Sequence, residues 1–140
     1  MGSPRRACLS SCSTLLVSLL AIVLASCADK PAASAALPKV AGAWTLTEEK
    51  VLAADAYPQV LATLGVVDAR TAVYAGPSPV TVRVFRMKSG TVAFEALQKW
   101  KPEKGVMHFY REAYFVLAET ADMKFVDAFD KATAWGRPGA

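Results

Sequence analysis

The chain has 140 residues, which gives room for one domain with a hydrophobic core and is too few for two. Its 16 basic and 12 acidic residues give a net charge of +4 without any polybasic run, which argues against nucleic-acid binding. The hydrophobic residues are concentrated near the N-terminus, where positions 7–28 carry no charge and follow directly on Arg5 and Arg6.

Residues 1–26 are predicted to form a secretory signal peptide. A basic start, an apolar stretch densest over 15–25, and small residues at Ala25 and Ser26 make the three-part pattern of such signals. The alternative is a retained membrane-spanning helix, but the densely apolar part has only the length of a signal's hydrophobic region. Both interpretations export the rest of the chain.

Residues 24–27 read "LASC" and resemble the bacterial lipobox, in which a branched apolar residue and two small residues precede a cysteine. The resemblance implies cleavage between Ser26 and Cys27, a diacylglyceryl thioether on the Cys27 sulfur, and a further acyl chain such as palmitate on its amine. Cys8 and Cys12 would leave with the signal, so the mature chain would carry no other thiol. Its net charge would be +2, from 14 basic and 12 acidic residues.

Residues 27–38 are predicted to be the lipidated N-terminus and a flexible tether, since 28–38 is mainly Ala, Pro and Ser without apolar periodicity. Fully extended, this tether reaches at most about 36–40 Å. Because Ala28 rather than an aspartate follows Cys27, the resemblance favours the outer membrane over the inner membrane. We expect the domain to face the periplasm.

We expect a single α+β domain over 39–135 and a short tail over 136–140. The predicted sheet is mostly antiparallel, has four or five strands, and carries two or three helices. Apolar alternation marks the strands, and apolar residues three and four positions apart mark the helices. The expected strands lie at 43–49, 71–75, 80–87, 105–110 and 113–119, and the expected helices at 58–64, 89–100 and 121–135.

Capping residues predict where the helices begin and end. Ser89 is expected at the start of the second helix, Thr120 at the start of the third, and Gly65 at the end of the first. The dipeptide "RE" at 111–112 is predicted to turn the hairpin between the last two strands. Asp127 stands four residues before a lysine, a spacing that favours an ion pair on a helix.

A weak internal echo appears when the sequence is shifted by 32 residues, since Val84 and Phe85 then fall on Val116 and Leu117. The implied unit is strand, strand, helix, used twice, which is one interpretation of the echo as a twofold ββα repeat. The alternative is that any two ββα units of similar length match this well. The α+β architecture is the same in both cases.

Three segments, "LGVVDARTAVYAG", "VTVRVFRMKSGTVAFEAL" and "GVMHFYREAYFVLAE", resemble an uncharacterised family of exported acidobacterial proteins, a domain of unknown function. The family has no established catalytic residues, so the resemblance implies a fold and transfers no activity. This chain has only "KPEKG" between helix and hairpin, where a longer insertion is expected in the family. The matching residues are Leu64, Gly65, Tyr74, Phe85, Ala93, Phe94, Phe109, Tyr110, Arg111 and Tyr114.

The sequence offers few residues for catalysis. His108 is the only histidine, and no cysteine or carboxylate stands at metal-ligand spacing from it, so we expect no metal site. Ser78 and Ser89 lie in turn and capping contexts, and the nucleophile-elbow, phosphate-loop and zinc-protease motifs are absent from the sequence. We therefore expect a protein that is not an enzyme, without catalytic residues or a cofactor, and with His108 on the exposed face of a half-buried sheet.

A binding surface is the favoured functional feature. Alternation over 80–87 places Arg83 on the same side of its strand as Phe85 and Met87, and aromatic and basic residues of the hairpin could extend that surface. The alternative is that both faces of the sheet are partly covered, with Phe85 and Tyr114 in the core. The candidate binding face comprises Arg83, His108, Tyr110, Arg111 and Tyr114.

Together these patterns predict a lipid-anchored, non-catalytic binding or envelope-associated protein whose partner is an unknown protein or small molecule. One alternative is a periplasmic enzyme that uses His108 or Arg83. Another is a structural subunit of an envelope complex, recognised through a sheet edge or through the tyrosines.

Overall fold

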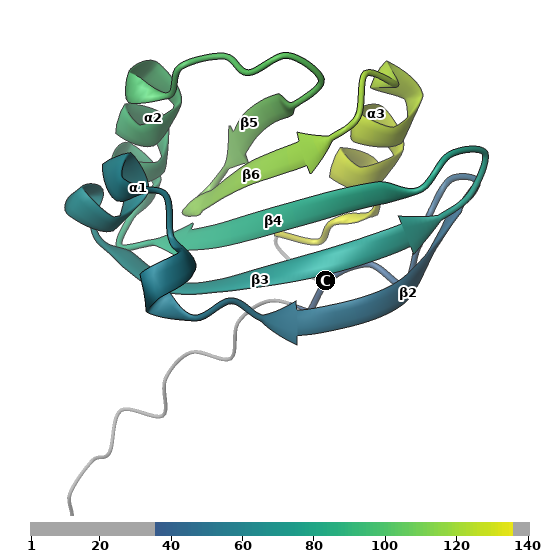
Figure 1. The fold of residues 1–140 in the computed structure, drawn as a ribbon, viewed down its shortest axis with the longest axis horizontal. Helices are drawn as coiled ribbons and strands as arrows, with labels where there is room; N and C mark the ends of the chain where they lie inside the picture. The colour runs from purple at the N-terminus through teal and green to yellow at the C-terminus, as the bar shows by residue number, and fades with distance from the viewer. Residues whose placement is uncertain (1–35, 136–140) are drawn as a thin grey trace, which may run out of the picture. The chain divides into compact units, whose positions relative to one another are not determined.

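The computed structural model describes residues 36–135. The predicted signal peptide 1–26, the cleavage site between Ser26 and Cys27, the lipidation site at Cys27, most of the tether and the tail 136–140 lie outside the described residues. Figure 1 shows an α+β domain in which one curled antiparallel sheet carries helices. Its strands are β1 (Val40–Ala41), β2 (Trp44–Val51), β3 (Val66–Ala75), β4 (Val80–Met87), β5 (Met107–Arg111) and β6 (Tyr114–Glu119), and its helices are α1 (Gln59–Leu64), α2 (Gly90–Lys99) and α3 (Met123–Ala132), with a short 3-10 helix at Ala54–Ala56.

The α+β class and the antiparallel sheet are confirmed, but the sheet has six strands rather than four or five, in the order β1-β2-β3-β4-β6-β5. The additional strand is β1, whose two residues are too few to show a periodicity. Gly42 has a φ of 61°, which lets the chain reverse at once, so that Val40 pairs with Thr45 of β2. Strand β3 also begins earlier than expected, at Val66, which pairs with Met87 of β4.

Strand β4 lies inside the sheet and is buried on both faces. Val80, Val82 and Val84 belong to the core on one side, and Phe85 and Met87 belong to the core on the other. This follows from the two-residue repeat of a strand, in which successive side chains point to opposite faces. Strand β4 therefore contributes apolar side chains to both cores, as expected for an internal strand, while Thr81, Arg83 and Arg86 are only half-buried.

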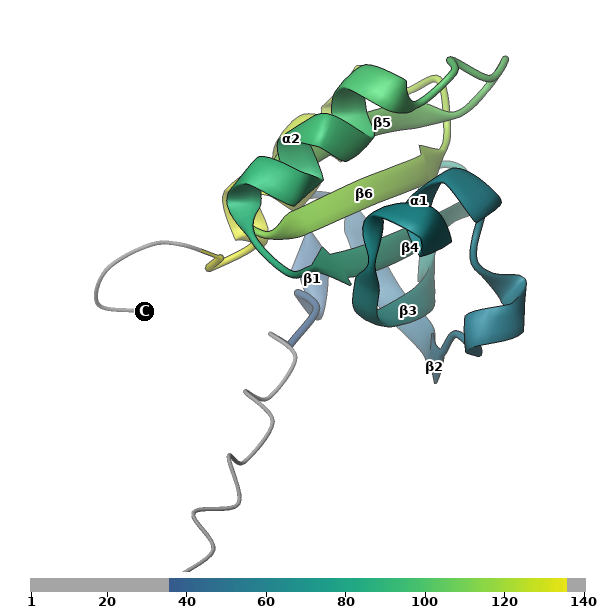
Figure 2. The same ribbon diagram turned by 90° about the vertical axis from the view of Figure 1, so that its left-hand side faces the viewer.

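The helices cover the two faces separately. Figure 2 shows α1 and α2 in front of the strands and α3 behind them. Leu61 of α1 and Ala93 of α2 are fully buried in the core on their side. Phe125 and Phe129 of α3 are fully buried in the core on the opposite side. The domain is therefore a sheet between two hydrophobic cores.

The helix ends agree with two of the three capping predictions. The hydroxyl of Ser89 accepts a hydrogen bond from the first turn of α2, and Gly65 ends α1 with a φ of 96°. The third prediction is wrong, because Asp122 caps α3 by accepting a hydrogen bond of 2.9 Å from the backbone of its first turn. Thr120 stands two residues too early and accepts from the N–H of Asp122 instead.

The turn between β5 and β6 consists of Glu112 and Ala113, one residue later than the predicted 111–112. Arg111 belongs to β5 and pairs with Tyr114, so two residues join the strands. Glu112 has a φ of 50°, a left-handed conformation that costs free energy in any residue with a side chain.

Tyr74 of β3 connects the sheet to the beginning of the described chain. Its ring is fully buried in the core beneath α3, and its hydroxyl donates a hydrogen bond of 2.8 Å to the carbonyl oxygen of Pro38. Leu37 is buried in the same core, so packing begins within the segment predicted as tether. Burial raises the pKa of Tyr74 well above its ordinary value of 10.0, and the charge of Glu49 adds to this shift.

We expect Tyr74→Phe to lower the free energy of unfolding by about 1 to 2 kcal/mol at pH 7, because the carbonyl of Pro38 loses its donor. A raised tyrosine pKa stabilises the fold below pH 10.0 and ceases to do so as the pH rises above that value. The difference between wild type and variant should therefore shrink in urea titrations between pH 9 and 11. Tyr110→Phe, at an exposed ring, is the control; an equal loss in both variants would contradict this account.

Candidate functional site

Strand β5 forms a free edge of the sheet, since among residues 36–135 it pairs with β6 alone. The backbone N–H of Met87 donates a hydrogen bond of 2.7 Å to the carbonyl oxygen of Ala113. Because backbone groups of successive residues point to opposite sides of a strand, the odd-numbered residues of β6 form their backbone hydrogen bonds with β4. The even-numbered residues of β6 therefore form their backbone hydrogen bonds with β5. Their partners in the register are the odd-numbered residues of β5. The backbone N–H and C=O groups of His108 and Tyr110 consequently point away from the sheet.

The two edges of the sheet differ in their protection. At the opposite edge, the short strand β1 covers the start of β2, and the rest of β2 carries Glu48, Glu49 and Lys50. Short strands and charged side chains are the usual protections against pairing with another chain. Strand β5 reads MHFYR without a proline or a bulge, and its one charged residue, Arg111, is bound by α3. Strand β5 is therefore the edge that is open to pairing.

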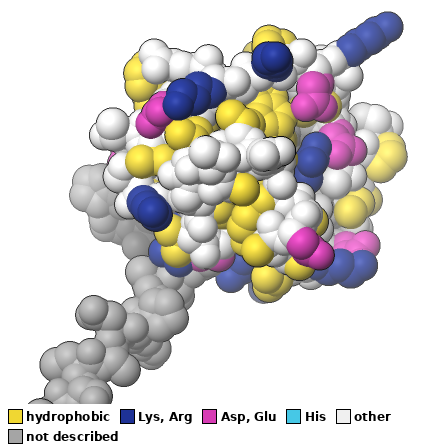
Figure 3. Space-filling view, turned by 60° about the vertical axis from the view of Figure 1, so that its left-hand side comes forward, with side chains coloured by type: hydrophobic (Ala, Val, Ile, Leu, Met, Phe, Trp, Pro, Cys, Tyr) yellow, Lys and Arg dark blue, Asp and Glu magenta, His cyan; other side chains and the backbone are white. Residues whose placement is uncertain are grey.

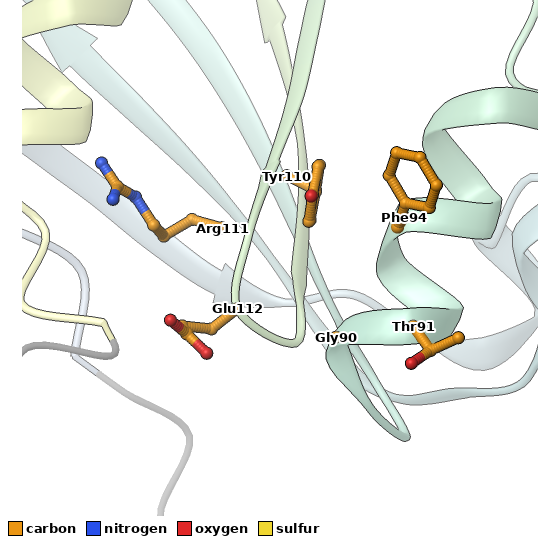
Figure 4. Close-up of a pocket in the computed structure, with 6 residues that line it drawn as sticks. All are labelled: Gly90, Thr91, Phe94, Tyr110, Arg111 and Glu112. Atoms are coloured by element: carbon orange, nitrogen blue, oxygen red, sulfur yellow. The ribbon is translucent and has the colours of Figure 1, made fainter.

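A hollow of about 630 Å³ lies beside β5 on the side of α2. Phe94 of α2 and Tyr110 of β5 lie side by side there (Figure 4). Their ring centroids are 5.5 Å apart. Both side chains are partly open to solvent, Phe94 to 42% and Tyr110 to 39%. Thr91 and Glu112 add polar groups to the lining. Exposed aromatic rings with a polar rim are typical of surfaces that bind other proteins.

A second hollow, of about 350 Å³, lies beside β5 on the side of α3. Phe109 of β5 and Val126 and Met123 of α3 supply its apolar lining. Met123 is 60% exposed, although methionine side chains are usually buried. Because Phe109 and Tyr110 are consecutive, their rings point to opposite faces, so the open edge stands between two partly apolar hollows.

Arg111 attaches the end of β5 to α3. Its Nε donates a hydrogen bond of 2.9 Å to Oδ1 of Asp130, and its Nη2 donates to Oδ2 of the same carboxylate. These hydrogen bonds and the charge of Asp130 raise the pKa of Arg111 above its ordinary value, with a smaller contribution from Glu112. In Figure 4 the guanidinium points away from Phe94. Arg111 therefore holds the edge strand in place.

The predicted binding face does not form one surface, because its members lie on both sides of the sheet. Arg83, His108 and Tyr110 lie on the α2 side of the sheet. Leu117 is fully buried and is the strand-pairing partner of both Arg83 and His108, so its side chain separates these two residues. Arg83 forms an ion pair of 3.4 Å with Glu119. His108, expected on an exposed face, is half-buried.

The other predicted members belong to the α3 side. Tyr114 stacks on Trp135 with ring centroids 4.3 Å apart and packs against the core there. Phe85, grouped with Arg83 as part of a mixed surface, is fully buried beneath α1 and α2. The alternative in which both faces are covered therefore describes this sheet.

Three residues around the edge were not predicted from the sequence. The apolar residues around Phe94 are spaced three and four positions apart, which predicts a helix. That spacing does not indicate that the Phe94 ring faces an open strand edge. Met123 at the start of α3 gives no signal of exposure. Glu112 could have been found, because a two-residue hairpin turn favours glycine or asparagine and a glutamate there is unusual.

The face that carries α1 and α2 shows hydrophobic patches with charges of both signs around them (Figure 3). A hollow of about 290 Å³ there is lined by Val60, Trp100 and Lys101, among others. The indole N–H of Trp100 is buried and finds no hydrogen-bond partner within the described part of the chain. The mixed charges do not select an acidic or a basic ligand for this hollow.

Comparison with known protein families, curated proteins and solved structures finds no match for this chain. The resemblance to the acidobacterial family therefore stays a prediction. Between residues 36 and 135, no group of three or more His, Cys, Asp or Glu side chains is placed to hold a metal ion. No helix in this part of the chain has the length and apolar character needed to cross a membrane.

We expect Arg111 and Asp130 to stabilise the fold jointly by about 1 kcal/mol, since their contact is bidentate and partly buried. A double-mutant cycle with Arg111→Ala and Asp130→Ala, measured by urea unfolding, gives this coupling energy. Lys131 and Asp127, an exposed helical pair at 2.7 Å, are the matched control and should couple by about 0.3 kcal/mol. Equal coupling in the two pairs would show that Arg111 does not hold the edge.

Proposed function

We propose that this protein is a lipid-anchored component of the bacterial envelope that acts by binding a polypeptide along β5 rather than by catalysis. The "LASC" segment supports attachment through Cys27, and Ala28 in place of an aspartate favours the periplasmic side of the outer membrane. The tether would hold the described domain close to the lipid surface. The single observation that carries the binding function is the unprotected edge of β5 between its two hollows.

The geometry of this edge suits an added strand. The outward backbone groups of His108 and Tyr110 offer hydrogen bonds to an extended segment, and such bonds supply affinity in strand addition. Alternate side chains of that segment would enter the hollow at Phe94 or the hollow at Met123, which supplies specificity. The exposed ring of Tyr110 belongs to the residue types that dominate binding energy at interfaces.

The enzyme alternative, with His108 or Arg83 as the active residue, finds less support. Leu117 fills the position between these two residues on the sheet. Nη2 of Arg83 is paired with Glu119, while its buried Nε finds no hydrogen-bond partner within the described residues. The ring centroid of His108 lies 6.4 Å from that of Phe115. The structural-subunit alternative agrees with the proposal, because it also requires recognition through a sheet edge.

A twofold ββα repeat stays a prediction about the origin of the fold. Val84 and Val116, which are 32 residues apart in sequence, are direct partners in the pairing of β4 with β6, which supports a local twofold relation. The helices that follow these strands oppose it, because α2 and α3 cover different faces of the sheet.

We expect Cys27→Ala to abolish labelling of the protein with a radioactive fatty acid and to move it from the detergent phase to the aqueous phase. In the proposed processing the diacylglyceryl group is attached to the thiolate of Cys27, so the alanine variant cannot receive it. Stable membrane attachment requires more than one acyl chain, so the variant should leave the detergent phase. Ser78→Ala, a change in an exposed turn, is the control and should leave partitioning unchanged. Unaltered partitioning of the Cys27 variant would contradict lipidation and favour a retained signal helix.

A photo-reactive phenylalanine in place of Tyr110 should form a covalent adduct to another polypeptide when cells carrying the full chain are irradiated. The same group in place of Val51, which is 78% exposed on the charged edge at β2, is the matched control and should form little adduct. Both are measured by immunoblotting of membranes. The absence of an adduct at position 110, with normal protein levels, would contradict binding along β5.

A further inference from the structure

We propose that the polypeptide bound along β5 is β5 of a second copy of this chain, so that two domains form a symmetric dimer with one continuous antiparallel sheet. This inference rests on the proposed function of the β5 edge and names its partner. It is carried by the direction of the free backbone groups, by the charges at the two ends of β5, and by the backbone conformation of Glu112.

The free backbone groups define the register of the dimer. An antiparallel pair centred on Phe109 overlaps the whole of Met107–Arg111 in both copies. His108 of one copy then stands opposite Tyr110 of the second copy, and these are the residues whose N–H and C=O groups point outward. The same two contacts occur twice about the twofold axis, so the edge is complementary to itself.

The charges at the two ends of β5 are opposite. Lys104 lies shortly before the strand and Glu112 directly after it, and both are exposed. Neither side chain forms an ion pair with another described residue. Antiparallel pairing brings the start of one strand beside the end of the other, so Lys104 of each copy approaches Glu112 of the second copy. This complementarity favours a second copy over an unrelated segment, which would have to supply both charges itself.

The conformation of Glu112 supports a role for its side chain. At a φ of 50° a glycine or asparagine would relax the backbone, yet a glutamate occupies the turn. Strained backbone that persists at an exposed turn is typical of functional positions. The apolar side chains near the edge agree with this account, since Phe94 and Met123 remain exposed on the two faces where the second domain comes alongside.

Disulfide cross-linking tests the register. In the proposed pairing Phe109 faces itself across a pair without direct hydrogen bonds, where Cα atoms are about 4.5 Å apart and a disulfide fits. Full-length Phe109→Cys protein, oxidised in native membranes, should form a cross-linked dimer, whereas Val51→Cys should not. Failure of Phe109→Cys to cross-link, or equal cross-linking at both positions, would overturn the register.

Charge reversal tests the same interface without disturbing packing. Glu112→Lys and Lys104→Glu should each weaken the dimer about tenfold, because every contact occurs twice, and the double variant should restore it. The dissociation constant is measured by sedimentation of the full lipidated protein in detergent. A wild-type protein that is monomeric at all concentrations, or a dimer unaffected by these changes, would overturn the proposal.

The outcomes also separate this inference from the proposed function. A monomer that still forms an adduct with a different envelope protein at position 110 overturns the second-copy assignment and leaves binding along β5 in place. A disulfide-linked dimer of the wild-type chain would contradict the proposed processing, because its thiol would have to be an unlipidated Cys27 or, in a retained signal, Cys8 or Cys12.

Discussion

The antiparallel pairing of β4 with β6 is the interaction on which the rest of the domain depends. It joins the β3–β4 hairpin to the β5–β6 hairpin through six residue pairs, from Thr81 with Glu119 to Arg86 with Tyr114. Because side chains alternate across these strands, the pair Val84 and Val116 enters one core and the pair beside it enters the other. Each helix then covers the core on its own side, so separation of β4 and β6 would open both cores at once.

The same pairing determines where the candidate site lies. It uses one side of β6, and the hairpin turn at Glu112 places β5 on the other side, where the sheet ends. The helices that follow β4 and β6 lie on opposite faces, which leaves β5 between them with a partly apolar hollow on each side. Arg111 fixes the end of the strand to α3 through Asp130, so the edge is held in place in the single chain, which would lower the entropy cost of the proposed binding.

Much of the fold could be predicted from the sequence, because local signals determine it: alternation over 80–87, the cap at Ser89 and the stop at Gly65 all agree with the structure. Two-residue β1 gave no periodic signal, and the cap of α3 was misplaced because Thr120 and Asp122 are both good capping residues. The candidate site was predicted less well. Tyr110 of the predicted face lies at the open edge. Arg83, Arg111 and Tyr114 were grouped with it without knowledge of strand order, which determines which strand is at the edge and which faces are covered. Strand order depends on contacts distant in sequence, such as that of Val84 with Val116.

Exchange of the backbone amide hydrogens of His108 and Tyr110 tests the central claim most directly, because these two N–H groups point away from β6 and toward the proposed partner strand. The measurement is amide hydrogen exchange by NMR on the full lipidated protein in detergent micelles, at protein concentrations that span dilute to concentrated solution. The account predicts slow exchange at both positions at high concentration and faster exchange on dilution, while Phe109, bonded to β6, stays protected throughout. Rapid exchange of His108 and Tyr110 at every concentration would contradict it.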